Sequence, residues 1–201
     1  MRITVIGASG ETGSRVVAEA LRRRHDVTAA TRRHGDATDP ATVARLAAGQ
    51  DVVVSATRPA PGAEHQHAAA ARALLDGMAG TGVRLLVVGG AGSLTVPGTD
   101  GRLAVDDPRF VPPQWRTIAL ASNAHFAAFA DAPDDVDWLY VSPSAHFAPG
   151  VRTGRYTVGG DELLVDAAGG SSLSMEDMAV ALLDEAETPR HHRTRITVGH
   201  T

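Results

Sequence analysis

The first fifteen residues constrain the fold of this chain more than any other stretch. Residues Ile3–Ile6 form a short run rich in β-branched side chains that stops at a glycine, which is typical of a buried parallel strand entering a tight turn. After the turn, apolar residues recur at helical spacing at Val16, Val17, Ala20 and Leu21. The order is therefore strand, glycine-rich turn and helix.

The glycines at positions 7, 10 and 13 are spaced as a dinucleotide-binding turn requires. Gly7 permits the sharp turn, Gly10 lets backbone N–H groups approach a pyrophosphate, and Gly13 lets the helix pack closely on the strand. The helix N-terminus then faces the phosphate charge, and the hydroxyls of Ser9 and Thr12 add donors. Glycine is abundant here, with 21 residues, so the position of the triplet between a strand and a helix is what gives it weight.

The rest of the chain continues the alternation of strand and helix. We expect parallel strands at about 26–30, 51–56, 83–88, 136–142 and 195–198, and helices at about 11–24, 40–48, 63–79, 116–130 and 174–187. This pattern predicts an α/β fold: a single Rossmann-type, doubly wound, mostly parallel sheet with helices on both faces. A chain of 201 residues suits one NAD(P)-binding domain over 1–201, with a small substrate-side region formed by about 91–116 and 143–172.

Three local details are also predicted. Short strands at 156–158 and 163–165 are expected around the turn at Gly159–Asp161. Ser174 and Asp177 have the spacing of a capping box at a helix start. The segment between the second strand and the second helix is too short for the third strand that dinucleotide folds usually have.

Composition excludes several classes of function. The net charge of −4 gives no sign of a nucleic-acid partner, and no apolar run approaches the length of a membrane span. The absence of cysteine excludes disulfides, thiolate metal sites and cysteine nucleophiles. The first strand follows Met1 directly, so we expect a cytoplasmic protein; all 19 basic residues are arginine, which suggests a GC-rich bacterial genome.

The tip of the second strand bears on the choice of cofactor. An acidic residue there would bind the ribose 2′-OH of NAD, whereas arginine accommodates the 2′-phosphate of NADP. This chain has Arg32 and Arg33 at the tip and no carboxylate, and guanidinium groups match phosphate geometry well. Glu11 in the glycine turn opposes this reading. The sequence favours NADP(H) over NAD(H).

Histidines and clustered cations are interpreted as solvated rather than as metal ligands. His65 and His67 are two residues apart, so on a helix they point in different directions, and we expect both to face solvent. Arg22–His25 are expected at a solvated helix end, and Arg190–Arg193 in a solvated turn before the last strand. No metal site is predicted.

Four segments together resemble one family. They are Ile3–Gly13, Gly35–Asp39, Val87–Ser93 and Gly154–Tyr156. The chain resembles the NAD(P)H-binding atypical short-chain dehydrogenase/reductase group, which includes NmrA-like proteins and NADH-flavin and biliverdin reductases. The resemblance covers essentially the whole chain, and the short segment after the second strand is a departure from its pattern.

This resemblance implies a set of cofactor contacts. The turn would bind phosphates, Arg32 the 2′-phosphate, Asp36 and Ala37 the adenine, and the ends of the later strands the ribose and nicotinamide. The complete candidate set is Gly7, Ala8, Ser9, Gly10, Glu11, Thr12, Gly13, Arg32, Arg33, Asp36, Ala37, Ala56, Thr57, Arg58, Gly90, Ser142, Pro143 and Ser144.

The catalytic pair of the wider superfamily is absent. That pair is Tyr-x-x-x-Lys, in which the ammonium lowers the pKa of the tyrosine, and this chain has no lysine. Tyr140 and Tyr156 are therefore interpreted as packing residues. Ser93 and His146 follow two strands at the carboxyl edge of the sheet and are the candidate catalytic residues; His146 lies about where the flavin and biliverdin reductase group has a histidine.

Three functions remain compatible with these residues. The first is an NADPH-dependent reductase of a flavin-like, quinone-like or other small conjugated acceptor, because such hydride transfer needs mainly alignment of two flat rings. The second is a non-catalytic NADP(H) sensor of the NmrA type. The third is a biosynthetic isomerase, cyclase or dehydratase that uses Ser93, His146 or Asp107. The partners expected are a small-molecule substrate and a second copy in a homodimer.

Overall fold

The computed structural model describes all 201 residues as nine strands and five α-helices joined by loops and short 3-10 turns. The strands are β1 (Arg2–Ile6), β2 (Asp26–Ala30), β3 (Val52–Ser55), β4 (Arg84–Val88), β5 (Trp138–Pro143), β6 (His146–Ala148), β7 (Thr157–Gly159), β8 (Ser172–Ser174) and β9 (Thr194–Gly199). The helices are α1 (Glu11–Arg22), α2 (Pro40–Ala47), α3 (His67–Met78), α4 (Arg116–Ala127) and α5 (Met175–Glu187).

Seven strands form the main sheet in the order β2-β1-β3-β4-β5-β9-β7. All neighbours are parallel except β7, which runs antiparallel to β9. The order reverses between β1 and β3, which is the switch point where ligands bind in folds of this kind. The predicted fold class is therefore confirmed.

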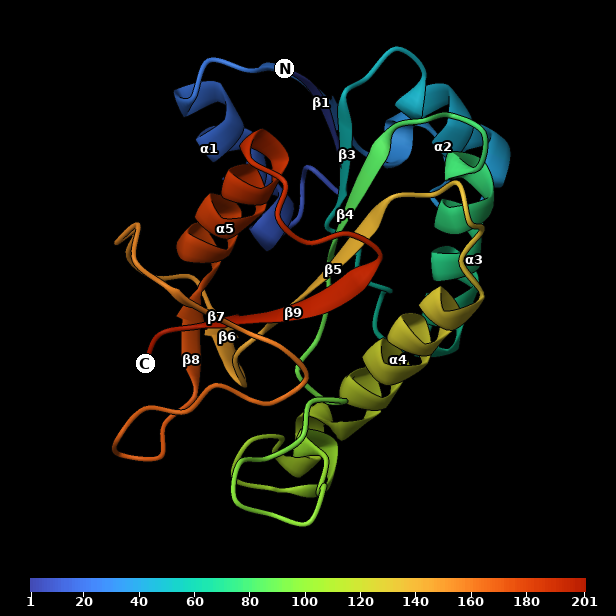
Figure 1. The fold of residues 1–201 in the computed structure, drawn as a ribbon. Helices are drawn as coiled ribbons and strands as arrows, with labels where there is room; N and C mark the ends of the chain where they lie inside the picture. Colours follow the sequence, from blue (N-terminus) through green and yellow to red (C-terminus); the bar gives the residue numbers. More distant parts are fainter.

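The sheet is covered on both faces, which explains why its central strands are continuous apolar runs. The helices α1 and α5 lie on one face, and α2, α3 and α4 lie on the other (Figure 1). Alternate residues of each strand enter separate cores: Val54 packs with α1 and α5, and Val53 packs with the other three helices. Both side chains are fully buried.

The outer edge of the sheet at β2 has no further strand. After β2 the chain makes a 3-10 turn at Arg32–His34 and reaches α2 at Pro40. Asp39 caps α2 by accepting hydrogen bonds from two backbone N–H groups, at 3.2 Å each. The predicted absence of a third strand in this segment is confirmed.

Several predicted element bounds differ from the structure. No strand forms at 163–165; Leu163 instead fills a small core, and only Glu162 makes an isolated bridge, to Thr95. The helix expected at 63–79 begins at His67, after a 3-10 turn, and α4 gives way to a 3-10 turn at Ala128. Helix α1 ends at Arg22 rather than at position 24.

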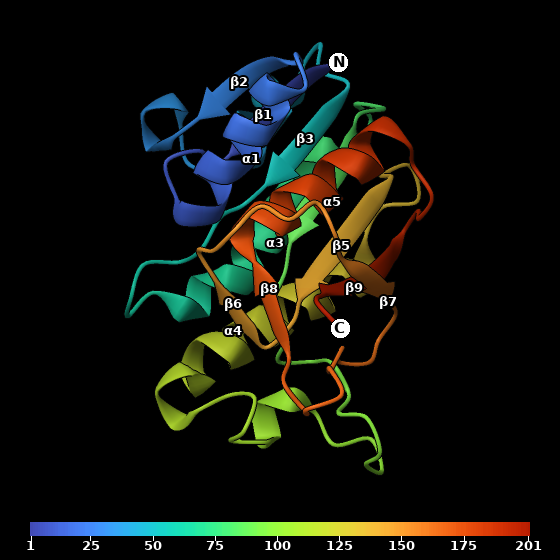
Figure 2. The same cartoon turned by 90° about the vertical axis from the view of Figure 1, so that its left-hand side faces the viewer.

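A second, two-stranded parallel sheet of β6 and β8 lies beside the main sheet, below α5 in Figure 2. The loop after β4 packs separately around an apolar cluster of six buried residues: Leu94, Val96, Ala104, Val105, Val111 and Leu163. The long irregular segment expected after Val88 is therefore anchored by a core of its own. A loop packed in this way presents a fixed surface rather than an open lid.

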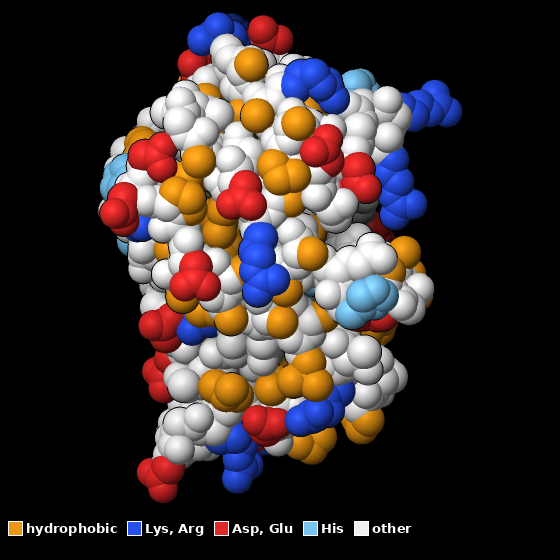
Figure 3. Space-filling view, turned by 90° about the vertical axis from the view of Figure 1, so that its right-hand side faces the viewer, with side chains coloured by type: hydrophobic (Ala, Val, Ile, Leu, Met, Phe, Trp, Pro, Cys, Tyr) orange, Lys and Arg blue, Asp and Glu red, His pale blue; other side chains and the backbone are white.

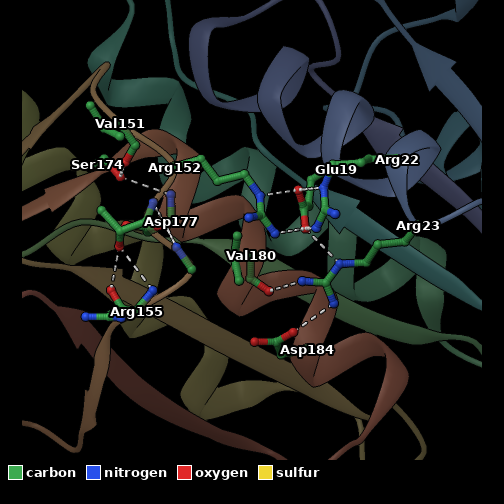
Figure 4. Close-up of polar contacts among 12 residues, drawn as sticks. Glu19, Arg22, Arg23, Val151, Arg152, Arg155, Ser174, Asp177, Val180 and Asp184 are labelled. Carbon is green, nitrogen blue, oxygen red and sulfur yellow. Dashed lines mark hydrogen bonds and ion pairs between the residues drawn. The ribbon is translucent and has the colours of Figure 1, made fainter.

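The segment between β6 and β7 is held by buried carboxylates (Figure 4). Glu19 of α1 accepts from Arg152 at 2.8 Å, and Asp177 of α5 accepts from the backbone N–H of Thr153 at 2.9 Å. Ser174 does cap α5, but the carboxylate of Asp177 is turned to this segment, so the predicted capping box is only half formed. The box is incomplete because the carboxylate of Asp177 binds Thr153, which is distant in the sequence.

Glu19 also binds the arginines at the C-terminal end of α1. It accepts hydrogen bonds from Arg22 and Arg23, and Arg23 reaches Asp184 of α5 at 2.7 Å. The hydrogen bond from Arg22 is the main reason why the pKa of Glu19 lies far below its usual range. The prediction of a solvated helix end was wrong for Arg23, which ties α1 to α5.

The face formed by α2, α3 and α4 carries apolar side chains scattered among charged ones (Figure 3). Trp115 and Leu120 are exposed at 53% and 42%. The homodimer stays a prediction, which light scattering on the purified protein tests.

Across the fold, none of the helices has both the length and the apolar character that a membrane span requires.

Candidate functional site

The turn after β1 is built on two backbone contacts that only glycine allows. Gly7 has φ +85°, and a Cβ there would lie 2.6 Å from the carbonyl oxygen of Ala56. A Cβ on Gly13 would lie 2.1 Å from the carbonyl oxygen of Gly7. Helix α1 thus packs directly against the turn, as the sequence predicts for a dinucleotide-binding turn.

The N-terminus of α1 has free donors. Gly10 is its N-cap and supplies no side-chain hydrogen bond, so the first-turn N–H groups of Glu11, Thr12 and Gly13 have no cap acceptor. The hydroxyls of Ser9 and Thr12 make no hydrogen bond within the protein, and Ala8 is buried below the turn. Uncapped N–H groups at the positive end of a helix form a site for an anion such as a pyrophosphate.

Arg32 and Arg33 lie at the tip of β2 in the 3-10 turn, and both are exposed. Neither guanidinium makes an ion pair or a hydrogen bond, in contrast to most arginines of the chain. Asp36 accepts from the backbone N–H of Thr38 at 2.9 Å, which lowers the pKa of its carboxyl group. Ala37 packs against the core beneath α2 and α3. The exposed guanidiniums are free to bind a phosphate.

The segment after β3 lies against the glycine turn. The N–H of Ala56 donates to the carbonyl of Ile6 at 2.9 Å, and Thr57 Oγ1 lies 3.3 Å from Ser55 Oγ. Arg58 extends over the ring of Trp115, with 5.8 Å between the guanidinium carbon and the ring centroid. This contact joins the segment after β3 to the start of α4.

The residues after β4 pack closely on α4, and the residues at the end of β5 lie against β9. A Cβ on Gly90 would lie 2.7 Å from Ser122 of α4. Ser142 is fully buried and its hydroxyl has no partner, and Pro143 is the last residue of β5. Ser144 donates its N–H to the carbonyl of Val198 at 2.9 Å, and its buried hydroxyl faces β9. The N–H and the hydroxyl of Ser144 are therefore both engaged within the protein.

The two candidate catalytic residues lie in different environments. Ser93 is half-buried in the turn from Ala91 to Leu94 and accepts a hydrogen bond from Arg195 at 2.7 Å. His146 begins β6 and is exposed, and its ring makes no hydrogen bond. No hydrogen bond brings Ser93 and His146 together. Each would have to act on a ligand separately.

Sequence reasoning missed a buried aromatic and histidine cluster below the carboxyl edge. His67 stacks on His125, with ring centroids 4.1 Å apart, and His125 Nδ1 lies 3.3 Å from Tyr140 Oη. Burial lowers the pKa of His67 to about 4 and that of His125 to about 3. The prediction that His67 faces solvent was wrong, because the chain turns inward at the start of α3. His65 is exposed, as predicted.

The remaining candidates have structural partners. Asp107 is buried and accepts from Arg109 at 2.6 Å, which lowers its pKa to about 2. His191 and His192 lie by Glu185 and Asp137 at 2.7 and 2.9 Å. No group of three histidine, aspartate or glutamate side chains has the geometry of a metal site. Tyr140 is buried, as expected of a packing residue.

Known proteins share this fold. Residues 7–189 match the model of the NAD(P)H-binding family. The chain belongs to that family. It is 39% identical to the protein YwnB of Bacillus subtilis, over 98% of both chains.

Solved structures agree with this assignment. A putative exported protein from Burkholderia pseudomallei is 39% identical, with a TM-score of 0.86 over 100% of both chains. A putative NADH-flavin reductase from Streptococcus pneumoniae is 29% identical, with a TM-score of 0.85 over 100% of both chains. The family resemblance found in the sequence is confirmed, and a nicotinamide cofactor and general oxidoreductase function are supported. The cytoplasmic location stays a prediction.

Proposed function

We propose that this protein is an NADPH-dependent reductase of a flavin-like, quinone-like or other small conjugated acceptor. The observation that carries the proposal is the packing of α1 against the turn, where a Cβ on Gly13 would lie 2.1 Å from the carbonyl of Gly7. Such close packing directs the uncapped N–H groups of α1 toward one anionic ligand. The likeness to a protein named as an NADH-flavin reductase supports the same class of acceptor.

The cofactor residues are proposed from their positions in the structure. The uncapped first turn of α1 would bind the pyrophosphate, and the segments after β3, β4 and β5 would bind the ribose and nicotinamide. The unpaired guanidiniums of Arg32 and Arg33 would bind the 2′-phosphate, which favours NADP(H) over NAD(H). Asp36 and Ala37, in the short segment after β2, would flank the adenine.

The chemistry suits an acceptor that needs no strong acid. When bound, the reduced nicotinamide supplies a hydride, which brings two electrons and one proton to the acceptor. A second proton, from water, then completes the reduction. The protein would align the two rings, and Ser93 or His146 would form a hydrogen bond to the acceptor. A Tyr-x-x-x-Lys pair is absent because the chain has no lysine.

The test is a titration followed by a turnover assay. NADPH and NADH would each be titrated by fluorescence, and NADPH loss would then be followed with FMN, a quinone and biliverdin. Tight binding of NADPH with turnover of any acceptor supports the proposal. Binding without turnover would favour a non-catalytic sensor, and binding of neither nucleotide would refute the assignment of the turn.

A second candidate is an isomerase or dehydratase on the same fold. A structure from Bacteroides thetaiotaomicron named as a putative epimerase is 36% identical, with a TM-score of 0.87 over 99% of this chain. An enzyme of that kind would use side chains such as Ser93 or His146 for acid–base chemistry. Turnover that is unaffected by removing NADPH would support it over the reductase.

A further inference from the structure

Arg195 is a buried arginine in β9, and its side chain is only 6% exposed. Its guanidinium lies over the ring of Phe126, 4.2 Å from the centroid, on the face of the sheet that also carries Tyr140. Arg195 Nε and Nη2 contact Asp161 Oδ1 at 2.7 and 2.6 Å, and Nη1 donates to Ser93 Oγ at 2.7 Å. Burying a guanidinium is costly, so its direction toward Ser93 calls for a reason.

The direction of the bond between Arg195 and Ser93 is fixed by chemistry. A guanidinium has only donors, so Ser93 Oγ must be the acceptor, and its own hydrogen points elsewhere. Ser93 Oγ has no other hydrogen-bond partner in the protein. Ser93 is half-buried, in a turn that begins directly after Gly90. It is therefore held as a donor without an acceptor.

We infer that Arg195 is a positioning residue that fixes Ser93 as a hydrogen-bond donor to a carbonyl oxygen or imine-type ring nitrogen of the acceptor. This inference rests on the proposed reductase function and narrows its substrate class to acceptors with such an atom. Because that atom gains electron density as the acceptor is reduced, the hydrogen bond from Ser93 strengthens during the reaction. Ser93 keeps its proton, and the guanidinium stabilises the polarised hydroxyl.

The experiment uses 1,4-naphthoquinone as the probe and the quenching of tryptophan fluorescence as the readout, without NADPH. We expect Ser93→Ala and Arg195→Met each to raise the Kd of the quinone about tenfold. The double variant should be no weaker than either single variant, because both remove the same hydrogen bond. Asp161→Asn is the matched control: it changes another partner of the same guanidinium but keeps an oxygen acceptor, and it should leave the Kd unchanged.

Further readouts separate this inference from the proposed function. The Kd of NADPH should stay unchanged in all these variants, and kcat with the quinone should fall more than KM rises. If the unaltered protein oxidises NADPH but Ser93→Ala leaves quinone binding and kcat unchanged, the inference fails and the reductase proposal stands. If NADPH does not bind but quinone binding still depends on Ser93, the reductase proposal fails alone. Should Arg195→Met not fold, Ser93→Ala still decides whether a donor is present.

Discussion

Replacing Gly13 with alanine tests the central feature of the site. The new Cβ would lie 2.1 Å from the carbonyl oxygen of Gly7, where side-chain carbons essentially never come closer than 3.0 Å, so α1 and the turn must separate by about 0.9 Å. Overpacking of this kind costs about 1–3 kcal/mol, and the better helix propensity of alanine returns about 1 kcal/mol. We expect Tm to fall by no more than about 8 °C.

The loss of cofactor binding should be much larger than the loss of stability. A shift of 0.9 Å moves first-turn N–H groups out of hydrogen-bond range of a bound phosphate. Losing two charge-assisted hydrogen bonds, at about 1.5 kcal/mol or more each, raises the Kd of NADPH by about a hundredfold or more. Gly160→Ala is the matched control, because nothing lies within 4 Å of a Cβ there. An unchanged Kd for NADPH in a folded Gly13→Ala protein would refute the reasoning.

Three further predictions concern charge. Arg32→Ala should weaken NADPH about tenfold or more while NADH changes little, with the exposed Arg72→Ala as control in the same titration. Burial depresses the pKa of His67 to about 4 and of His125 to about 3, so the free energy of unfolding should fall as pH drops below 6.5. Between pH 7 and pH 4.5, Tm should therefore fall less in His67→Phe than in the unaltered protein. Glu19→Gln should lower the free energy of unfolding in urea by about 3 kcal/mol, since it replaces the buried charged acceptor of Arg23 and Arg152 with a neutral amide; a loss below about 1 kcal/mol would contradict the role of Glu19 in holding the segment between β6 and β7.

The parts of the fold that depend on local pattern were predictable. The run at Ile3–Ile6 and the glycines after it define strand, turn and helix within fifteen residues, and the apolar strands had to be buried on both faces. The missing third strand also followed from length alone. These features need no knowledge of distant contacts.

The errors involve partners far away in the sequence. Asp177 has the right spacing to complete a capping box, but Thr153 and Gly154 take its carboxylate. His67 has no local signal of burial, because its neighbour in space is His125, 58 positions later in the chain. Helical and strand periodicity report which face is apolar, and they do not report which polar groups meet across it.

Arg195 is the one missed residue for which a signal existed. It stands next to Ile196 in a strand whose following residues are all buried, and a charged side chain in such a position must have an ion-pair or hydrogen-bond partner. Its partners are Asp161 and Ser93, and the contact with Ser93 depends on how the loop after β4 packs around Leu94 and Val105. The sequence could thus indicate that the side chain of Arg195 has a partner, and only the structure identifies the partners.

The distribution of paired arginines yields a last prediction about the acceptor. All three arginines of the loop at 91–116 are paired with a carboxylate: Arg102 and Arg109 share Asp107, and Arg116 contacts Asp106. This loop therefore has no free cation for an acceptor phosphate, in contrast to the tip of β2. FMN and riboflavin share one ring system and differ in the phosphate, so we expect their kcat/KM values to agree within about threefold and to change little with salt. A free guanidinium on the phosphate would favour FMN by about tenfold or more, and that result would place a cation at the acceptor site and refute the argument.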